Sequence, residues 1–285
     1  MIFWIASYPK SGNTWLRTLI SAYYYSKDGF YNQSLLKNIS QFPEKSHYVS
    51  FEYNSSEITD TTRLWIKAQE KINEDKKIRF FKTHNIFGSV NNCKFTNKQN
   101  SIACIYIVRD PRNVVTSLKN HYELDDEKAL KWMTNNKHFI YDVGKVKESG
   151  YGDFQFISSW EMNYKSWKNQ KEIPVKIIRY EDLLKETYTV FTDVIEFINK
   201  TLNIKKIDKD KIKKSVSSTF FHKLKNDEKN NGFEEAVPSK NNGETIPFFY
   251  LGPDNDWRKI LDNNQKLKFN DIFKKQLKEL GYEEN

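Results

Sequence analysis

The first seventeen residues combine a strand, a tight loop and a helix, and this order constrains the fold more than any other stretch of the chain. Residues 2–6 are a short apolar run rich in β-branched and aromatic types, which predicts a strand. Pro9 and Gly12 punctuate a turn over residues 7–13, and apolar residues recur at helical spacing from Thr14 onward. A strand that enters a helix through such a loop directs backbone N–H groups and the helix N-terminus at one point. That arrangement is typical of an anion site.

The loop carries side chains that suit a phosphate. Lys10 adds full charge, and Ser11, Asn13 and Thr14 add donors. The other interpretation is a plain strand–turn–helix whose lysine and serine face solvent. A Walker A motif is excluded, because it requires Gly-x-x-x-x-Gly-Lys-Ser/Thr, whereas here Lys10 precedes Gly12 and no glycine lies upstream. The order therefore disfavours a kinase or NTPase of the usual P-loop pattern.

Composition sets broader limits. A chain of 285 residues is long enough for one large α/β domain or two small ones, and 15% aromatic residues supply ample core. The net charge of +9 suits an anionic ligand, a nucleic acid or an acidic surface, but the charges are scattered along the chain and therefore carry little weight. Cys93 and Cys104 are too few for a disulfide framework and lack metal-ligand spacing, which predicts a reducing, cytoplasmic setting. We expect no signal peptide and no membrane span.

Strand-like and helix-like stretches alternate along the chain. Further strands are predicted at residues 78–82, 101–108 and 173–180. The alternation predicts an α/β fold with a central, mainly parallel sheet flanked by helices, in a single domain over residues 1–285. Helices are expected at residues 33–39, 60–75, 111–121, 160–169, 183–199 and 264–280, the last closed by Gly281. Residues 205–224 predict a weaker helix and a turn, residues 122–158 predict two short helices, and polar loops are expected at 144–152 and 225–245.

In parallel sheets, ligands bind at the carboxyl ends of the strands, and this rule gathers Lys10, Lys82, His84, Arg109 and Tyr180. A lone histidine is more often structural than catalytic. Beside a strand-end lysine and opposite a phosphate loop, however, it can remove a proton from a hydroxyl or amine while lysines balance charge on a transferring anion. Arg109 either pairs with Asp110 or, with Ser117, holds a second phosphate. By pattern alone, Trp15 and Phe221 belong to the core.

These motifs resemble, in order along nearly the whole chain, those of the soluble sulfotransferases that use 3′-phosphoadenosine 5′-phosphosulfate (PAPS) as donor and release adenosine 3′,5′-bisphosphate (PAP). The first is Tyr-Pro-Lys-Ser-Gly-Asn-Thr-Trp over residues 8–15, which looks like the 5′-phosphosulfate loop of that family. The others are Lys-Thr-His at 82–84, Ile-Val-Arg-Asp-Pro-Arg at 107–112 with Ser117, Ile-Arg-Tyr-Glu-Asp-Leu at 178–183, Ser-Thr-Phe-Phe-His-Lys-Leu at 218–224, and the stretch 252–257.

The resemblance implies a P-loop-NTPase-like sulfotransferase fold and in-line sulfuryl transfer from PAPS, with no metal required. It implies that Lys10 contacts the phosphosulfate bridge, that Lys82 meets the sulfuryl oxygens, and that His84 is the general base. The remaining implied donor contacts are Ser11, Gly12, Asn13 and Thr14 to the 5′-phosphate, Trp15 and Phe221 on the two faces of the adenine, Tyr180 and Thr219 also at the adenine, Arg109 and Ser117 to the 3′-phosphate, and Gly252 in the last phosphate loop.

One departure matters. The eukaryotic cytosolic members carry Arg-Lys-Gly in the last phosphate loop, whereas this chain has Tyr250, Leu251 and Gly252. Two 3′-phosphate donors are therefore missing there, and the backbone at Gly252, Lys240 or Arg258 are possible substitutes.

The sequence favours a hydroxyl or amine of a small soluble acceptor, and it predicts neither a nucleic-acid nor a membrane partner. The oligomeric state stays open between monomer and homodimer. Two other functions remain as alternatives, a non-catalytic nucleotide-binding module and a P-loop small-molecule kinase.

Overall fold

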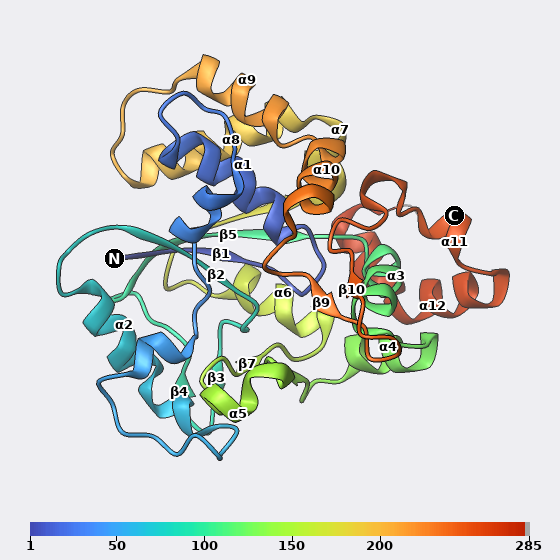
Figure 1. The fold of residues 1–285 in the computed structure, drawn as a ribbon, viewed down its shortest axis with the longest axis horizontal. Helices are drawn as coiled ribbons and strands as arrows, with labels where there is room; N and C mark the ends of the chain where they lie inside the picture. Colours follow the sequence, from blue (N-terminus) through green and yellow to red (C-terminus); the bar gives the residue numbers. More distant parts are fainter. Residues whose placement is uncertain (283–285) are drawn as a thin grey trace.

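The computed structural model describes residues 1–282, and a four-stranded parallel sheet forms its centre (Figure 1). The strands are β1 (Ile2–Ala6), β2 (Arg79–Thr83), β5 (Ser101–Val108) and β8 (Val175–Arg179), in the spatial order β2-β1-β5-β8. All four agree with the strands predicted from the sequence to within two residues at each end. The mainly parallel α/β fold is therefore confirmed.

Helices cover both faces of the sheet because successive strand residues point to opposite sides. In β1, Trp4 and Ala6 enter one core, whereas Phe3 and Ile5 enter the other. The core around Phe3 is closed by α1 (Asn13–Tyr25), α8 (Thr187–Thr201) and α9 (Lys209–Ser218), which lie together above the sheet in Figure 1. The core around Trp4 is closed mainly by α2 (Trp65–Asn73), α3 (Pro111–Tyr122), α6 (Trp160–Asn169) and α12 (Asn263–Leu280).

The strand order positions the site. The chain runs from β1 to β2 on one side and from β5 to β8 on the other, so that the loops after the neighbouring strands β1 and β5 diverge. A crevice opens at such a switch point, at the carboxyl ends of the strands. Here the crevice is bridged by Arg109, whose Nη1 donates to the carbonyl oxygen of Lys10 at 3.1 Å. The loop after β1, which carries Lys10, and the end of β5 are therefore neighbours, as predicted.

Three stretches of the structure differ from the expectations. The predicted loop at 144–152 begins with the short helices η4 (Val143–Lys145) and α5 (Val146–Ser149). The helix predicted over 183–199 is two helices, α7 (Tyr180–Lys185) and α8, because the backbone at Glu186 leaves the helical region with φ −129° and ψ 53°. The first part of the predicted loop 225–245 belongs to the helix α10 (Phe221–Asn231). Only Leu224 is buried in α10, so that this helix carries no apolar periodicity for the sequence to show.

Shorter elements complete the fold. None of the helices within residues 1–282 is long and apolar enough to cross a membrane. The remaining helices are η1 (Gln33–Asn38), η2 (Lys45–Tyr48), η3 (Asp60–Leu64), α4 (Asp126–Thr134), η4 (Val143–Lys145), α5 (Val146–Ser149), η5 (Gly252–Asp254) and α11 (Trp257–Ile260), and the hairpins pair β3 (Ser89–Val90) with β4 (Cys93–Lys94), β6 (Phe139–Ile140) with β7 (Gln155–Phe156), and β9 (Val237–Pro238) with β10 (Thr245–Ile246).

Candidate active site

A cavity of about 1870 Å³ lies at the carboxyl ends of the strands. It brings together most of the residues that the sequence singled out. Two of them do not line it, because Ser11 is fully buried in the loop and the hydroxyl of Thr219 donates to the carbonyl oxygen of Ser215 at 2.9 Å. Those that line it are Lys10, Gly12, Asn13, Thr14, Trp15, Lys82, His84, Arg109, Ser117, Tyr180, Phe221 and Gly252.

The loop before α1 has a backbone that only certain residues adopt. Lys10 and Gly12 both have positive φ, 63° and 98°. A Cβ at Gly12 would also lie 2.4 Å from Cδ2 of Tyr180, so that glycine is required here for two reasons. The side-chain nitrogen of Asn13 donates inward to the carbonyl oxygen of Ile5 at 3.0 Å and to Oγ of Ser7 at 3.2 Å. Asn13 therefore ties the loop to β1, and only its backbone N–H remains for an anion.

Aromatic side chains form a second part of the cavity. Trp15 meets Tyr180 edge to face with ring centroids 5.7 Å apart, and its indole nitrogen donates to the carbonyl oxygen of Thr219 at 3.0 Å. The guanidinium carbon of Arg109 lies over the Tyr180 ring, 4.3 Å from its centroid. Gly252 packs so closely on Phe221 that a Cβ there would lie 2.2 Å from the ring. Trp15 and Phe221 are both only partly buried, which leaves ring surface for a planar ligand.

His84 is held in one tautomer. Its Nδ1 lies 2.7 Å from the carbonyl oxygen of Ser7. A carbonyl oxygen only accepts, so that Nδ1 carries the hydrogen and Nε2 keeps a free lone pair. The backbone N–H of His84 donates to Oε1 of Gln155 at 2.7 Å, and its carbonyl oxygen accepts from Nδ2 of Asn163 at 2.9 Å. Burial, and then the charge of Lys82, lower the pKa of His84 to about 3. At neutral pH the imidazole is therefore uncharged, and its Nε2 is unprotonated.

Two lysines bring positive charge into the cavity, Lys82 near His84 and Lys10 near His121. Burial lowers the pKa of Lys10 to about 7, and Nζ of Lys10 lies 3.9 Å from the centroid of the Phe248 ring. Burial also lowers the pKa of Lys82, although the carboxylate of Glu235 opposes this. In both cases burial disfavours the charged ammonium, and an anion bound nearby would stabilise the charged form.

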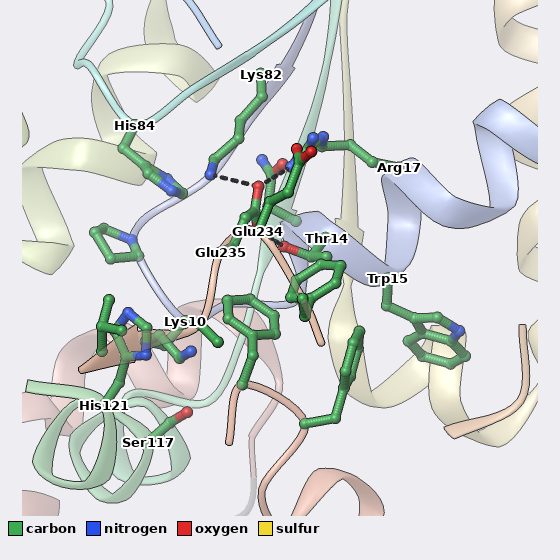
Figure 2. Close-up of a pocket in the computed structure, with 18 of the residues that line it drawn as sticks. Lys10, Thr14, Trp15, Arg17, Lys82, His84, Ser117, His121, Glu234 and Glu235 are labelled. Carbon is green, nitrogen blue, oxygen red and sulfur yellow. Dashed lines mark hydrogen bonds and ion pairs between the residues drawn. The ribbon is translucent and has the colours of Figure 1, made fainter. Parts of the chain in front are cut away.

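The sequence analysis missed three residues of the site: Arg17, Glu235 and Phe248. The carboxylate of Glu235 accepts from Thr14 Oγ1 at 2.6 Å, from Arg17 Nη1 at 2.5 Å and from Lys82 Nζ at 3.1 Å (Figure 2). The spacing of Arg17, one helical turn after Thr14, is a signal that places both on one face of α1. Glu235 and Phe248 come from the segment after α10, where no local pattern marks them.

Comparison with known proteins gives the family. The profile of the sulfotransferase domain matches residues 2–281. The chain belongs to the sulfotransferase family. It is similar to the luciferin sulfotransferase of Photinus pyralis, with 22% identity over 96% of this chain and 70% of the relative. Sulfotransferase 1B1 of Canis lupus familiaris is 24% identical over 96% of this chain and 82% of the relative.

Solved structures share the fold of this sulfotransferase. Mouse sulfotransferase SULT7A1 complexed with PAP superposes with a TM-score of 0.54 at 19% identity, covering 97% of this chain and 84% of that one. Retinol dehydratase in complex with androsterone and PAP superposes with a TM-score of 0.56 at 16% identity, covering 97% of this chain and 80% of that one. These likenesses confirm the sulfotransferase-type α/β fold.

The stretch of residues 250–252 has no basic pair, and Lys240 and Arg258, which were considered as substitutes, have other contacts. The backbone N–H of Lys240 donates to Oε2 of Glu123 at 2.6 Å, and Nζ donates to the carbonyl oxygen of Tyr122 at 3.3 Å. The guanidinium of Arg258 stacks over the Trp257 ring at 4.7 Å. Within residues 1–282, no group of three or more His, Cys, Asp or Glu side chains is arranged to hold a metal.

The buried histidines predict acid sensitivity. Burial lowers the pKa of His47 and His138 to about 4 and that of His84 and His121 to about 3. Below the ordinary histidine pKa of about 6.5, the unfolded chain binds protons that the folded chain does not. The free energy of unfolding therefore decreases as the pH is lowered. We expect the free energy of unfolding to drop between pH 7.5 and 5.5 by up to about 1 kcal/mol per histidine.

Urea unfolding at the two pH values measures this drop. The variant His121→Phe removes one such histidine from an aromatic contact with Phe248 and should show a smaller drop. Equal stability of the wild type at both pH values would contradict the prediction.

Proposed function

We propose that this sulfotransferase transfers a sulfuryl group in line from PAPS to a hydroxyl or amine of a small acceptor, with His84 as the general base. The observation that carries the proposal is the pairing of a neutral, oriented His84 with Lys10 and Lys82 at one end of a cavity. A binding module has no need of an oriented base. The PAP complexes of mouse SULT7A1 and of retinol dehydratase, which share the fold, support the choice of donor.

The site fits an adenosine nucleotide with two anionic ends. Ser11 Oγ and Arg109 Nε are buried without a hydrogen-bond partner among the described residues, and each therefore retains capacity for a ligand. On this proposal the 5′ end is bound by Lys10, Thr14, the buried Ser11 and the backbone of Gly12 and Asn13. Arg109, Ser117 and the backbone of Gly252 bind the 3′-phosphate, and Trp15, Tyr180 and Phe221 surround the adenine. Thr219, which does not line the cavity, contributes by accepting from the indole nitrogen of Trp15.

The chemistry then follows from charge and position. The bound donor supplies the sulfuryl group. Lys82 neutralises its oxygens, Lys10 neutralises the departing phosphate oxygen, and Nε2 of His84 accepts the proton of the acceptor. Holding the acceptor and the sulfur in line accounts for much of the rate, as in phosphoryl transfer.

The acceptor pocket is proposed to lie at the far end of the cavity. Its wall is aromatic, since the Trp132 ring packs at a tilt against Tyr122 and His138, with ring centroids 4.7 and 4.4 Å apart. Phe139 and Tyr141 continue the same wall. A small molecule with an apolar body and one nucleophilic group suits this lining. We also propose a reducing cytoplasmic setting, which the two unpaired cysteines support.

The choice of donor is tested by ligand-dependent thermal stability. PAP should raise the melting temperature in proportion to the logarithm of its concentration, and ATP with magnesium should raise it much less. Stabilisation by ATP but not by PAP would rule out this donor and favour a kinase. Incubation with PAPS and an acceptor mixture, followed by mass spectrometry, then identifies the acceptor by its gain of one SO₃.

The role of His84 is tested by His84→Ala. We expect turnover to fall by about 10²- to 10⁴-fold, because the acceptor proton loses its base, while the dissociation constant of PAP stays close to that of the wild type. His47→Asn is a control that removes a partly buried histidine outside the cavity lining and should leave turnover unchanged. Near wild-type turnover of His84→Ala would exclude His84 as the base.

The depressed pKa of Lys10 predicts proton uptake on donor binding. Burial lowers this pKa to about 7, and a phosphate at the loop raises it again. PAP binding at pH 8 should therefore take up close to one proton, and PAP affinity should fall as the pH rises above about 7. Calorimetric titration in buffers of different ionisation enthalpy measures the uptake, and Lys10→Met should abolish it. Uptake that persists in Lys10→Met would assign the proton to another group.

A further inference from the structure

The carboxylate of Glu235 lies at the centre of the cations of the site. It belongs to the segment of residues 232–249, between α10 and η5, which lines one side of the cavity. Figure 2 shows Thr14, Arg17 and Lys82 directed at it from α1 and β2. One oxygen accepts from Thr14, and the other accepts from both Arg17 and Lys82. A phosphate or sulfate group uses the same hydroxyl, guanidinium and ammonium donors.

Glu235 is ionised in this position. Burial alone would raise its pKa, but the charges of Lys82 and Arg17 outweigh that effect and hold the pKa well below its usual range. Its side chain is 23% exposed and that of Arg17 is 6% exposed, so that the pair is largely removed from water. Glu235 thus supplies the negative charge that these buried cations need.

The neighbouring glutamate shows that this placement is specific. Glu234 is 76% exposed and pairs with Lys37 at the surface, 3.4 Å away. The segment is attached elsewhere without Glu235, since Glu228 accepts from the backbone N–H groups of Phe248 and Phe249 at 2.6 and 2.9 Å. The Glu235 contacts are therefore not the only attachment of the segment.

We propose that Glu235 is a built-in competitor for the donor, which must leave the Thr14–Arg17–Lys82 cluster before the 5′-phosphosulfate binds there. The inference rests on the proposed function, because Thr14 and Lys82 are donor residues in that proposal. It adds Arg17 to the donor site. The observed donor affinity is then the intrinsic affinity reduced by the cost of displacing the carboxylate. Ligands without an anion at the 5′ position do not compete with Glu235.

The test compares Glu235→Gln with the matched control Glu234→Gln, which removes the same charge one residue away. Two probes are titrated by calorimetry: PAP, and adenosine 3′-monophosphate, which lacks the 5′ anion. Glu235→Gln should tighten PAP by on the order of tenfold, a typical coupling between two ligands. It should leave adenosine 3′-monophosphate unchanged, and Glu234→Gln should change neither.

A second measurement separates competition from a structural role. Without ligand, Glu235→Gln should melt at a lower temperature than the wild type, because Arg17 and Lys82 lose their counter-charge. Lower stability together with tighter PAP binding is the signature of a displaced competitor. Glu235→Ala should give the same two signs, and circular dichroism verifies that both variants are folded.

Three outcomes would overturn the inference: unchanged or weaker PAP binding by Glu235→Gln, equal tightening of both nucleotides, and equal tightening by Glu234→Gln. In each case PAP still binds the wild type, and the proposed donor stands. Failure of PAP to bind the wild type and every variant would instead refute the proposed donor itself.

Discussion

Positive charge buried at the carboxyl ends of parallel strands needs a matching anion, and this requirement organises the site. β1 and β2 pair in register from Ile2 opposite Arg79 to Ala6 opposite Thr83, so that the two strands end together. The loop that carries Lys10 and the strand residue Lys82 are therefore forced into one place. Burial there lowers the pKa of both lysines. A carboxylate and an aromatic ring, from Glu235 and Phe248, are the groups that face these charges.

Much of this arrangement could be predicted from the sequence, because it depends on local patterns and one rule of topology. The apolar runs mark the strands, and the glycine at position 12 marks the sharp turn into α1. The carboxyl-end rule then brings Lys82, His84 and Arg109 to the loop without any knowledge of the tertiary contacts. The tautomer of His84 could not be predicted from the sequence, because it depends on the carbonyl oxygen of Ser7, a partner 77 positions away.

The rest could not be predicted, because it comes from closure of long loops. Thr14 and Glu235 are 221 positions apart, and no periodicity connects them. The helix α10, which ends just before the 232–249 segment, is polar on nearly all sides and gives no apolar stripe to detect. Asn13 shows the same limit at short range: its residue type allows an anion contact, but a partner in β1 takes its amide.

The two ends of the proposed donor site differ in charge. This difference indicates which end contributes most to the affinity for the donor. At the proposed 3′ end, Tyr250 and Leu251 stand where the resemblance leads one to expect a basic pair, and Lys225 donates to the carbonyl oxygen of Tyr250 at 2.9 Å. In the proposed function, Arg109 is the cation that binds the 3′-phosphate. At the 5′ end, Lys10, Arg17 and Lys82 converge. If the donor binds as proposed, its electrostatic binding energy is concentrated at the 5′ end, where the carboxylate of Glu235 also lies. Exchange of this carboxylate for the donor anion would then set the donor affinity.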